Sequence, residues 1–272
     1  MELMWSWFGE AFSLGAIHGI TGILTVLLQL PSLPAAHLPA LLQTLTSLCT
    51  ITAQHSGHLP MSLPPRPLPP TRSSPLVQIC HGAPGLLLAL AAARRRGAWM
   101  SEWNEAARAA SETVWREGLV SKGAGVCHGW AGNAWPWLLY YDAVARAGQG
   151  GGGSGGERDG GSRGDGVGAG GLDPDECLAR ALAFLMHAAE KVPLEGSWKG
   201  DVEAERYPWS LFEGLAGTVC AWADACVVIV ERLEAMNREE GIGIERQGLA
   251  AAQKVPVLGV PGFGWESGLL GS

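Results

Sequence analysis

Two short segments of the chain place a cysteine directly before a histidine and a glycine. They are Cys80-His81-Gly82 and Cys127-His128-Gly129, in a chain with six cysteines. Thiolate sulfur and imidazole nitrogen are ligand types that zinc prefers. The glycines beside them allow sharp turns and the close approach of another group. The pattern therefore predicts a zinc site that includes Cys127 and His128, with either Cys80 or His81 as a further ligand.

The same two segments belong to a longer repeat of glycine loops. Loops of one common frame occur at His18–Gly22, His81–Gly85, His128–Gly132 and Glu213–Gly217. Each interval between loops holds an apolar helical pattern followed by an amphipathic one. An apolar helix suits an inner layer and an amphipathic helix an outer layer, so we expect helix hairpins stacked into a double-layered ring or arc. Strand patterns are nearly absent, and the predicted fold class is all-α, with the loops gathered at one end.

Composition and charge narrow the classes of function. The chain has 272 residues, 47% of them apolar, and a net charge of −7, so it can bury a core but has no basic patch for nucleic acid. The apolar stretch Thr218–Val230 is short and contains Asp224, so we expect no membrane span. The first ten residues lack the basic region of a secretory signal. We expect a cytoplasmic, reducing compartment in which the cysteines are thiols or metal ligands.

We expect one domain over residues 1–272, with three irregular segments. They are a Pro-rich loop at 59–75, a Gly-rich insertion at 148–171 and a tail at 239–272. Arg94–Arg96 followed by glycine is typical of a helix end. The remaining cysteines lie in helical patterns and are predicted to be small hydrophobic residues of the core: Cys49, Cys177, Cys220 and Cys226.

Four motifs in combination resemble a known family. The motifs are His-Gly-x-x-Gly, Cys-His-Gly-Ala-Pro-Gly, Lys-Gly-x-Gly-x-Cys-His-Gly-x-Ala-Gly-Asn and Ser-Leu-Phe-Glu-Gly-Leu-Ala-Gly-Thr. They resemble the eukaryotic branch of the lanthionine synthetase C-like (LanC-like) family, over Phe12–Ala147 and Pro174–Val230. The resemblance implies an α/α toroid of seven inner and seven outer helices around zinc. Because only four loop signatures are present, we expect an incomplete toroid that lacks its N-terminal part.

The resemblance also implies roles for individual residues. It assigns one zinc ion to Cys80, Cys127 and His128, which leaves the fourth position open as in catalytic zinc sites. His81 then has a structural, hydrogen-bonding role. His18 is the candidate catalytic acid, although the family's acidic partner for this histidine has no visible counterpart here. Lys122 and Arg206 are the residues that the resemblance associates with glutathione.

The implied activity is the addition of a glutathione or cysteine thiol to dehydroamino acids in peptides or proteins, which forms a thioether such as lanthionine. The alternative is a non-catalytic regulatory protein that binds zinc and glutathione, peripheral to the plasma membrane. A third interpretation, a glycan- or prenyl-processing enzyme, rests on the toroid shape alone and lacks paired carboxylates.

Overall fold

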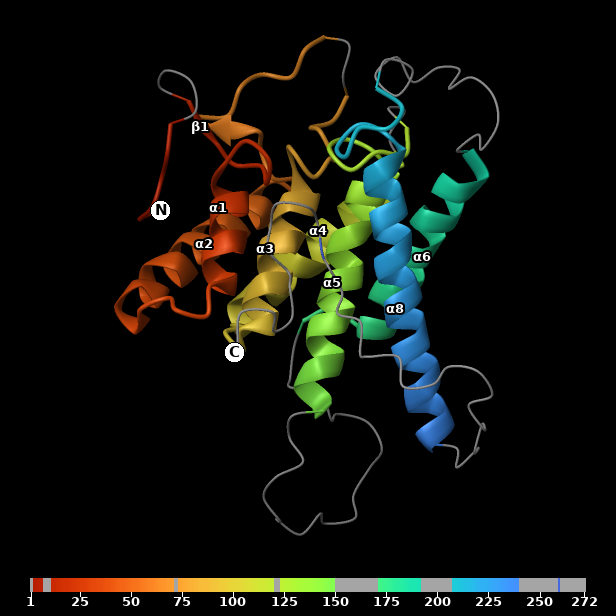
Figure 1. Ribbon diagram of the computed structural model, residues 1–272. Helices are drawn as coiled ribbons and strands as arrows, with labels where there is room; N and C mark the ends of the chain where they lie inside the picture. The colour runs from red at the N-terminus through yellow and green to blue at the C-terminus, as the bar shows by residue number, and fades with distance from the viewer. Residues whose placement is uncertain are drawn as a thin grey trace.

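The computed structural model describes residues 2–6, 11–70, 73–119, 123–149, 171–191, 207–239 and 259. These residues form helices joined by irregular loops (Figure 1). The helices are α1 (Ile20–Gln29), α2 (Leu38–Gln54), α3 (Ala83–Arg95), α4 (Asn104–Glu117), α5 (Trp130–Gln149), α6 (Pro174–Lys191) and α8 (Leu215–Glu239). Two-residue strands β1 (Phe12–Ser13) and β2 (Ser62–Leu63) pair antiparallel, and single 3₁₀ turns precede α2 and α4, at Ala35–His37 and Ser101–Trp103.

The helices form two layers. In the inner layer α3 contacts α1 and α5, and α5 contacts α8, so the order follows the chain. The outer layer consists of α2, α4 and α6, of which α4 packs on α3 and α6 on α5. Each inner helix begins two residues after the histidine or glutamate that opens one of the glycine loops, and the loops lie together at the upper end in Figure 1. The predicted all-α, double-layered toroid fold, present here as an arc, is confirmed.

The sequence explains which helix is inner and which is outer. Helix α3 is buried at every position from Ala83 to Ala93, since its run of Leu and Ala offers no polar face. Helix α4 buries a single stripe that includes Ala106, Ala110 and Val114 and exposes its charged positions. Burial on one face at helical spacing is typical of a helix that covers a core.

Two buried tryptophans of α5 connect it to its neighbours. The Trp137 indole N–H donates to Ser111 Oγ of α4 at 2.8 Å, and the Trp135 indole N–H donates to Asp224 Oδ2 of α8 at 2.8 Å. The backbone N–H of Gly259 donates to the same Asp224 oxygen at 2.7 Å. A buried indole N–H or carboxylate needs such partners, so these bonds fix how α4 and α8 sit against α5.

The predicted helix end at Arg94–Arg96 is confirmed, and each arginine has a distinct contact. Arg94 lies over the Trp99 ring at 5.4 Å, and Arg95 lies 3.9 Å from the buried carboxylate of Asp142. Arg96 Nη1 donates to the carbonyl oxygens of Leu28 and Leu30 at 2.9 and 3.0 Å. Those carbonyls end α1 and have no partner within that helix, so Arg96 caps the neighbouring inner helix.

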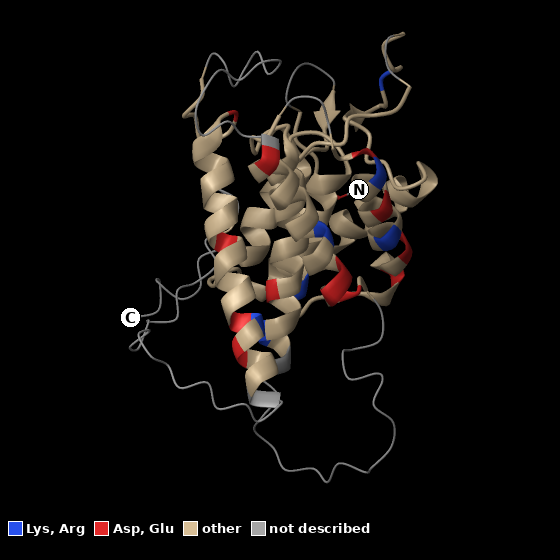
Figure 2. Ribbon diagram, turned by 90° about the vertical axis from the view of Figure 1, so that its right-hand side faces the viewer, with Lys and Arg blue, Asp and Glu red and all other residues tan. Residues whose placement is uncertain are grey.

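The irregular segments are described in part. In the Pro-rich loop, residues 64–70 are exposed, whereas Ser62–Leu63 forms β2 and pairs with β1. Helix α5 extends to Gln149 and α8 to Glu239, and apart from Gly171 and Gly259 the rest of the segments 148–171 and 239–272 lies outside the described residues. Across the part of the chain that the structure describes, no helix combines the length and the apolarity needed to cross a membrane. In Figure 2, acidic and basic residues lie interspersed along the described helices.

The cap between α3 and α1 gives a test of the inner layer. We expect Arg96→Ala to lower the free energy of unfolding by about 1.5–3 kcal/mol, because two carbonyls lose a charged donor. The control is Arg116→Ala, which removes an ion pair with Glu112 whose side chains are 62% and 45% exposed. That change should cost less than about 1 kcal/mol. Urea denaturation measures both, and equal midpoints for the two variants would contradict the capping role.

Candidate metal centre

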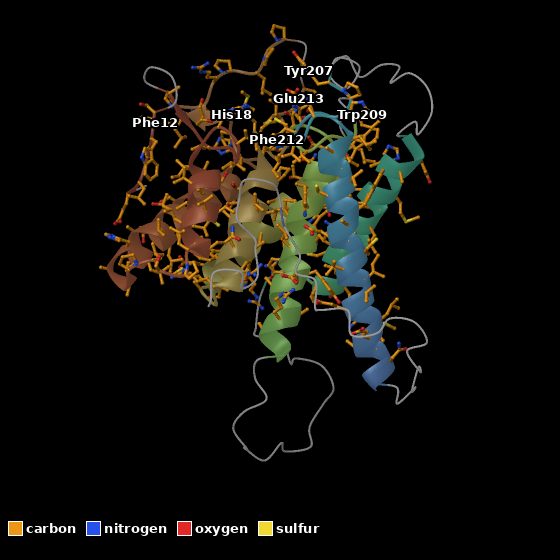
Figure 3. All side chains as sticks on the ribbon, viewed as in Figure 1. Phe12, His18, Tyr207, Trp209, Phe212 and Glu213 are labelled. Carbon is orange, nitrogen blue, oxygen red and sulfur yellow. The ribbon has the colours of Figure 1, made fainter. Side chains whose placement is uncertain are left out.

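The glycine loops place their functional residues at one end of the inner helices. His18 lies between β1 and α1, the Cys80-His81 pair directly precedes α3, and the Cys127-His128 pair precedes α5. Figure 3 shows His18, Phe212 and Glu213 at this end, above the helices. The loops therefore converge as the repeat predicts.

Backbone hydrogen bonds join each loop to the next. The N–H of Ala16 donates to the carbonyl of Ile79 at 3.1 Å, and the N–H of Cys80 donates to the carbonyl of Cys127 at 3.2 Å. The N–H of Cys127 in turn donates to the carbonyl of Phe212 at 2.7 Å. The three loops that carry histidine and the following Glu213 loop thus form one connected backbone.

Glycine permits this close approach at two equivalent positions. Gly15 and Gly125 each lie three residues before a loop histidine. A Cβ on Gly15 would lie 1.8 Å from the carbonyl oxygen of Cys80, and one on Gly125 would lie 2.7 Å from that of Glu213. Any side chain at either position would push neighbouring loops apart. The close approach that the glycines beside the Cys-His pairs predict occurs at Gly125, and Gly15 holds the equivalent position in the His18 loop.

Asn133 is a further residue that sequence reasoning did not single out. It is fully buried on α5, and its Nδ2 donates to the carbonyls of Val77 at 2.9 Å and Gly118 at 2.8 Å. Val77 lies just before Cys80, and Asn133 just after His128. One amide therefore fixes the Cys80 loop against the helix that carries the Cys127 loop.

The three predicted zinc ligands lie together. The ligand atoms of Cys80, Cys127 and His128 are all within 4.8 Å of one another, with Cys80 buried and the other two partly buried. Around a tetrahedral zinc with Zn–S bonds of about 2.3 Å, neighbouring ligand atoms are about 3.8 Å apart. A small contraction would therefore suffice, and two sulfurs with one nitrogen suit this ion.

His18 and His81 border the same centre. Their ligand atoms, with that of Cys80, form a second group within 4.8 Å, so Cys80 belongs to both groups. The two imidazole rings stack with centroids 4.9 Å apart and planes at 27°. His81 therefore has both a ring contact and a position from which it can bind metal.

The neighbours of Cys127 lower the pKa of its thiol and so favour the thiolate form. A hydrogen bond with Cys80 is the main cause that lowers its pKa, and His128 and His18 add to this effect. Partial burial opposes the shift, and the pKa of Cys127 falls from 9.0 to about 5. The single proton of the Cys80 thiol can also be donated to Gln78 Oε1, which lies 3.3 Å from the sulfur. The buried amide of Gln78 is thus a neighbour that orients Cys80.

The other cysteines divide between core and surface. Cys49 and Cys177 are buried as predicted, and burial raises the pKa of both thiols, that of Cys49 to about 12. Cys220 is half-buried and packs against the core. Cys226 is exposed, so its assignment to the core was wrong. On the same helix α8, Ala221, Ala225 and Val228 are buried.

An apolar groove lies beside His18. Its volume is about 420 Å³, and it follows α1 past Ile23, Val26 and Leu27, with Trp5 on its other side. His18 is one of its lining residues, so a group bound there would contact the imidazole. Lys122 and Arg206, the residues associated with glutathione by resemblance, lie outside the described residues.

The fold and this centre together define a double-layered α/α protein with a candidate zinc site on its loop end. A family model described as lanthionine synthetase C-like protein matches residues 2–147, more than half of the 272 residues. The chain belongs to this family, as its motifs predicted.

Two relatives agree with this assignment. The chain is 32% identical over 225 residues to a zebrafish (Danio rerio) protein named "Glutathione S-transferase LANCL1", which covers 82% of this chain and 45% of the relative. It is also 32% identical over 226 residues to "LanC-like protein GCL1" of Arabidopsis thaliana, covering 82% of this chain and 42% of the relative. The chain thus spans less than half the length of these relatives.

The lowered pKa of Cys127 predicts unusual reactivity in metal-free protein. Because the thiolate is the nucleophile, the rate of alkylation of Cys127 by iodoacetamide should be half-maximal near pH 5 rather than near pH 9. Peptide mass spectrometry of chelator-treated, folded protein would measure this rate between pH 4 and 10. Buried Cys49 should stay unmodified over this range as the internal control. A half-maximal rate near pH 9 would contradict the thiolate assignment.

Proposed function

We propose that the protein is a zinc-dependent enzyme that adds the thiol of glutathione or of a cysteine to dehydroamino acids in peptides or proteins. The observation that carries this proposal is the convergence of the Cys80, Cys127 and His128 ligand atoms within 4.8 Å, with His18 against the same cysteine. The product is a thioether.

Cys80, Cys127 and His128 would hold one zinc ion. Three protein ligands leave one position open, as in catalytic zinc sites. Bound there, zinc would keep the incoming thiol in its thiolate form at neutral pH. The lowered pKa of Cys127 supports metal binding, because this ligand need not lose a proton when the ion arrives.

His18 would supply the proton that completes the addition. The sulfur forms a bond to the β-carbon of the dehydroamino acid, and the alkene electrons move to the α-carbon, where the adjacent carbonyl stabilises them. The imidazolium N–H of His18 donates its proton to that α-carbon. The thiol proton lost before attack balances the proton gained, so the reaction needs no oxidant or reductant.

The groove along α1 would accommodate an apolar part of the peptide. Its lining of Ile23, Val26 and Leu27 leads to His18, so a side chain bound in it would hold the reacting residue beside the imidazole. Glutathione as thiol donor is supported by the printed name of the zebrafish relative. The cations of Lys122 and Arg206 would suit its carboxylates.

One observation favours a second candidate. The acidic partner that the family resemblance implies for His18 has no visible counterpart in the sequence. The chain would then be a non-catalytic regulatory protein that binds zinc and glutathione, in the cytoplasm or peripheral to the plasma membrane. The two candidates differ in turnover and agree in zinc content.

Metal content tests the centre that both candidates share. We expect about one zinc per chain after dialysis against a weak chelator, and well below one in Cys127→Ala, which loses a thiolate ligand. Cys226→Ala is the matched control, because this exposed cysteine of α8 is outside the metal-ligand groups and its loss should leave zinc unchanged. A folded wild type without zinc would exclude both candidates.

Turnover separates the candidates. His18→Ala should slow thioether formation between glutathione and a dehydroalanine peptide at least about 100-fold, because the proton donor is lost. Mass spectrometry of the peptide measures the rate, and zinc content should be retained. The control is His37→Ala, in an exposed turn before α2. A wild type that binds zinc and glutathione without turnover would establish the binding protein instead.

A further inference from the structure

We infer that His18, Cys80 and His81 form a second, weaker metal site that takes another zinc ion when the metal is in excess. Their ligand atoms all lie within 4.8 Å of one another, as do those of the first group. Cys80 is common to both groups, so its sulfur would bridge two ions. This site goes beyond the single zinc of the proposed function and uses a histidine, His81, that has no part in it.

The five side chains do not fit a single ion. They form two groups of three that meet only at Cys80, rather than one larger cluster. Cys127 and His128 belong to one group, and His18 and His81 to the other. Zinc in protein sites is almost always four-coordinate, so one ion could not use all five donors. The arrangement instead provides two adjacent metal positions, one on each side of the Cys80 sulfur.

The backbone holds the second group in place. The loop of His18 is attached to the loop of Cys80 by the bond between the Ala16 N–H and the Ile79 carbonyl, 3.1 Å long. Gly15 lies so close to the Cys80 carbonyl that a Cβ there would be 1.8 Å from it. The stacked rings of His18 and His81, 4.9 Å apart, both adjoin the cysteine. Such fixed donors need little rearrangement to bind an ion.

The charges of the donor groups predict which of the two metal sites binds zinc first. Two thiolates balance the +2 charge of an ion bound by Cys80, Cys127 and His128. An ion bound by His18, Cys80 and His81 gains only neutral imidazoles around a sulfur already shared, and it is repelled by the first ion. We therefore expect its affinity to be weaker by more than about tenfold. One sulfur and two nitrogens select zinc or cadmium over magnesium and calcium.

Occupation of the second position has a chemical consequence that rests on the proposed function. A metal on the His18 ring removes the proton that the addition requires. Excess zinc should therefore inhibit thioether formation, whereas the first equivalent supports it. His81→Ala should be resistant to this inhibition, because the second site loses a ligand while His18 is retained.

Zinc titration followed by native mass spectrometry, with a competing chelator to rank affinities, tests the inference. The wild type should bind one ion tightly and a second more weakly. His81→Ala should keep only the tight ion, Cys127→Ala only the weak one, and Cys80→Ala neither. His37→Ala, in the exposed turn before α2, should bind two ions like the wild type.

Cadmium-113 NMR of the unmodified chain gives a readout that requires no variant to fold. Two resonances are expected, with shifts typical of two sulfurs and one nitrogen and of one sulfur and two nitrogens. A wild type that takes one ion at saturating metal, or a His81→Ala variant that takes two, would overturn the second site. If the second site is overturned but Cys127→Ala loses the tightly bound ion, the proposed function is still supported. If Cys127→Ala changes nothing at the tight site, the proposed function fails separately.

Discussion

The close approach of neighbouring glycine loops is the constraint on which the candidate metal centre depends. Cys80 and Cys127 lie on different loops, and the hydrogen bond from the N–H of one to the carbonyl of the other holds these loops together. The same kind of bond links the His18 loop to the Cys80 loop. Glycine at positions 15 and 125 is the condition for this contact, because any Cβ would meet a carbonyl of the next loop. The candidate ligands lie close together because the backbones of their loops are hydrogen-bonded to one another.

The packing of the two helical layers places these loops at the same end of the molecule. Helix α3 is buried from Ala83 to Ala93 and helix α5 from Ala131 to Val144, and the two pack side by side, so their first turns lie at one end of the molecule. Asn133 then connects the start of α5 to the segment before Cys80. Most buried residues belong to the helices, whereas the candidate metal ligands belong to the loops. Substitution of a candidate ligand can therefore change this site while the layers remain packed.

Sequence reasoning predicted the parts that depend on local pattern. The repeat of His-Gly-x-x-Gly predicted loops at one end, and the unbroken apolar run of α3 predicted an inner helix. It could not give Asn133 or Gln78 a role, because their partners are set by contacts between loops distant in sequence. The pairing of β1 with β2 was also missed, since two-residue strands carry no alternation. Cys226 was misplaced because its helix is apolar on more than one face, so periodicity did not distinguish inside from outside.

The buried carboxylate of Asp224 has a consequence for the late part of the chain. It accepts one hydrogen bond from the Trp135 indole and one from the backbone of Gly259, itself buried. Gly259, beyond α8 in the chain, thereby shares an acceptor with Trp135 of the inner layer. Its amide proton should exchange with solvent water only when its hydrogen bond to Asp224 opens. The rate of isotope exchange at Gly259 would thus report the release of this residue from the inner layer, at a position where the sequence alone indicated an irregular tail.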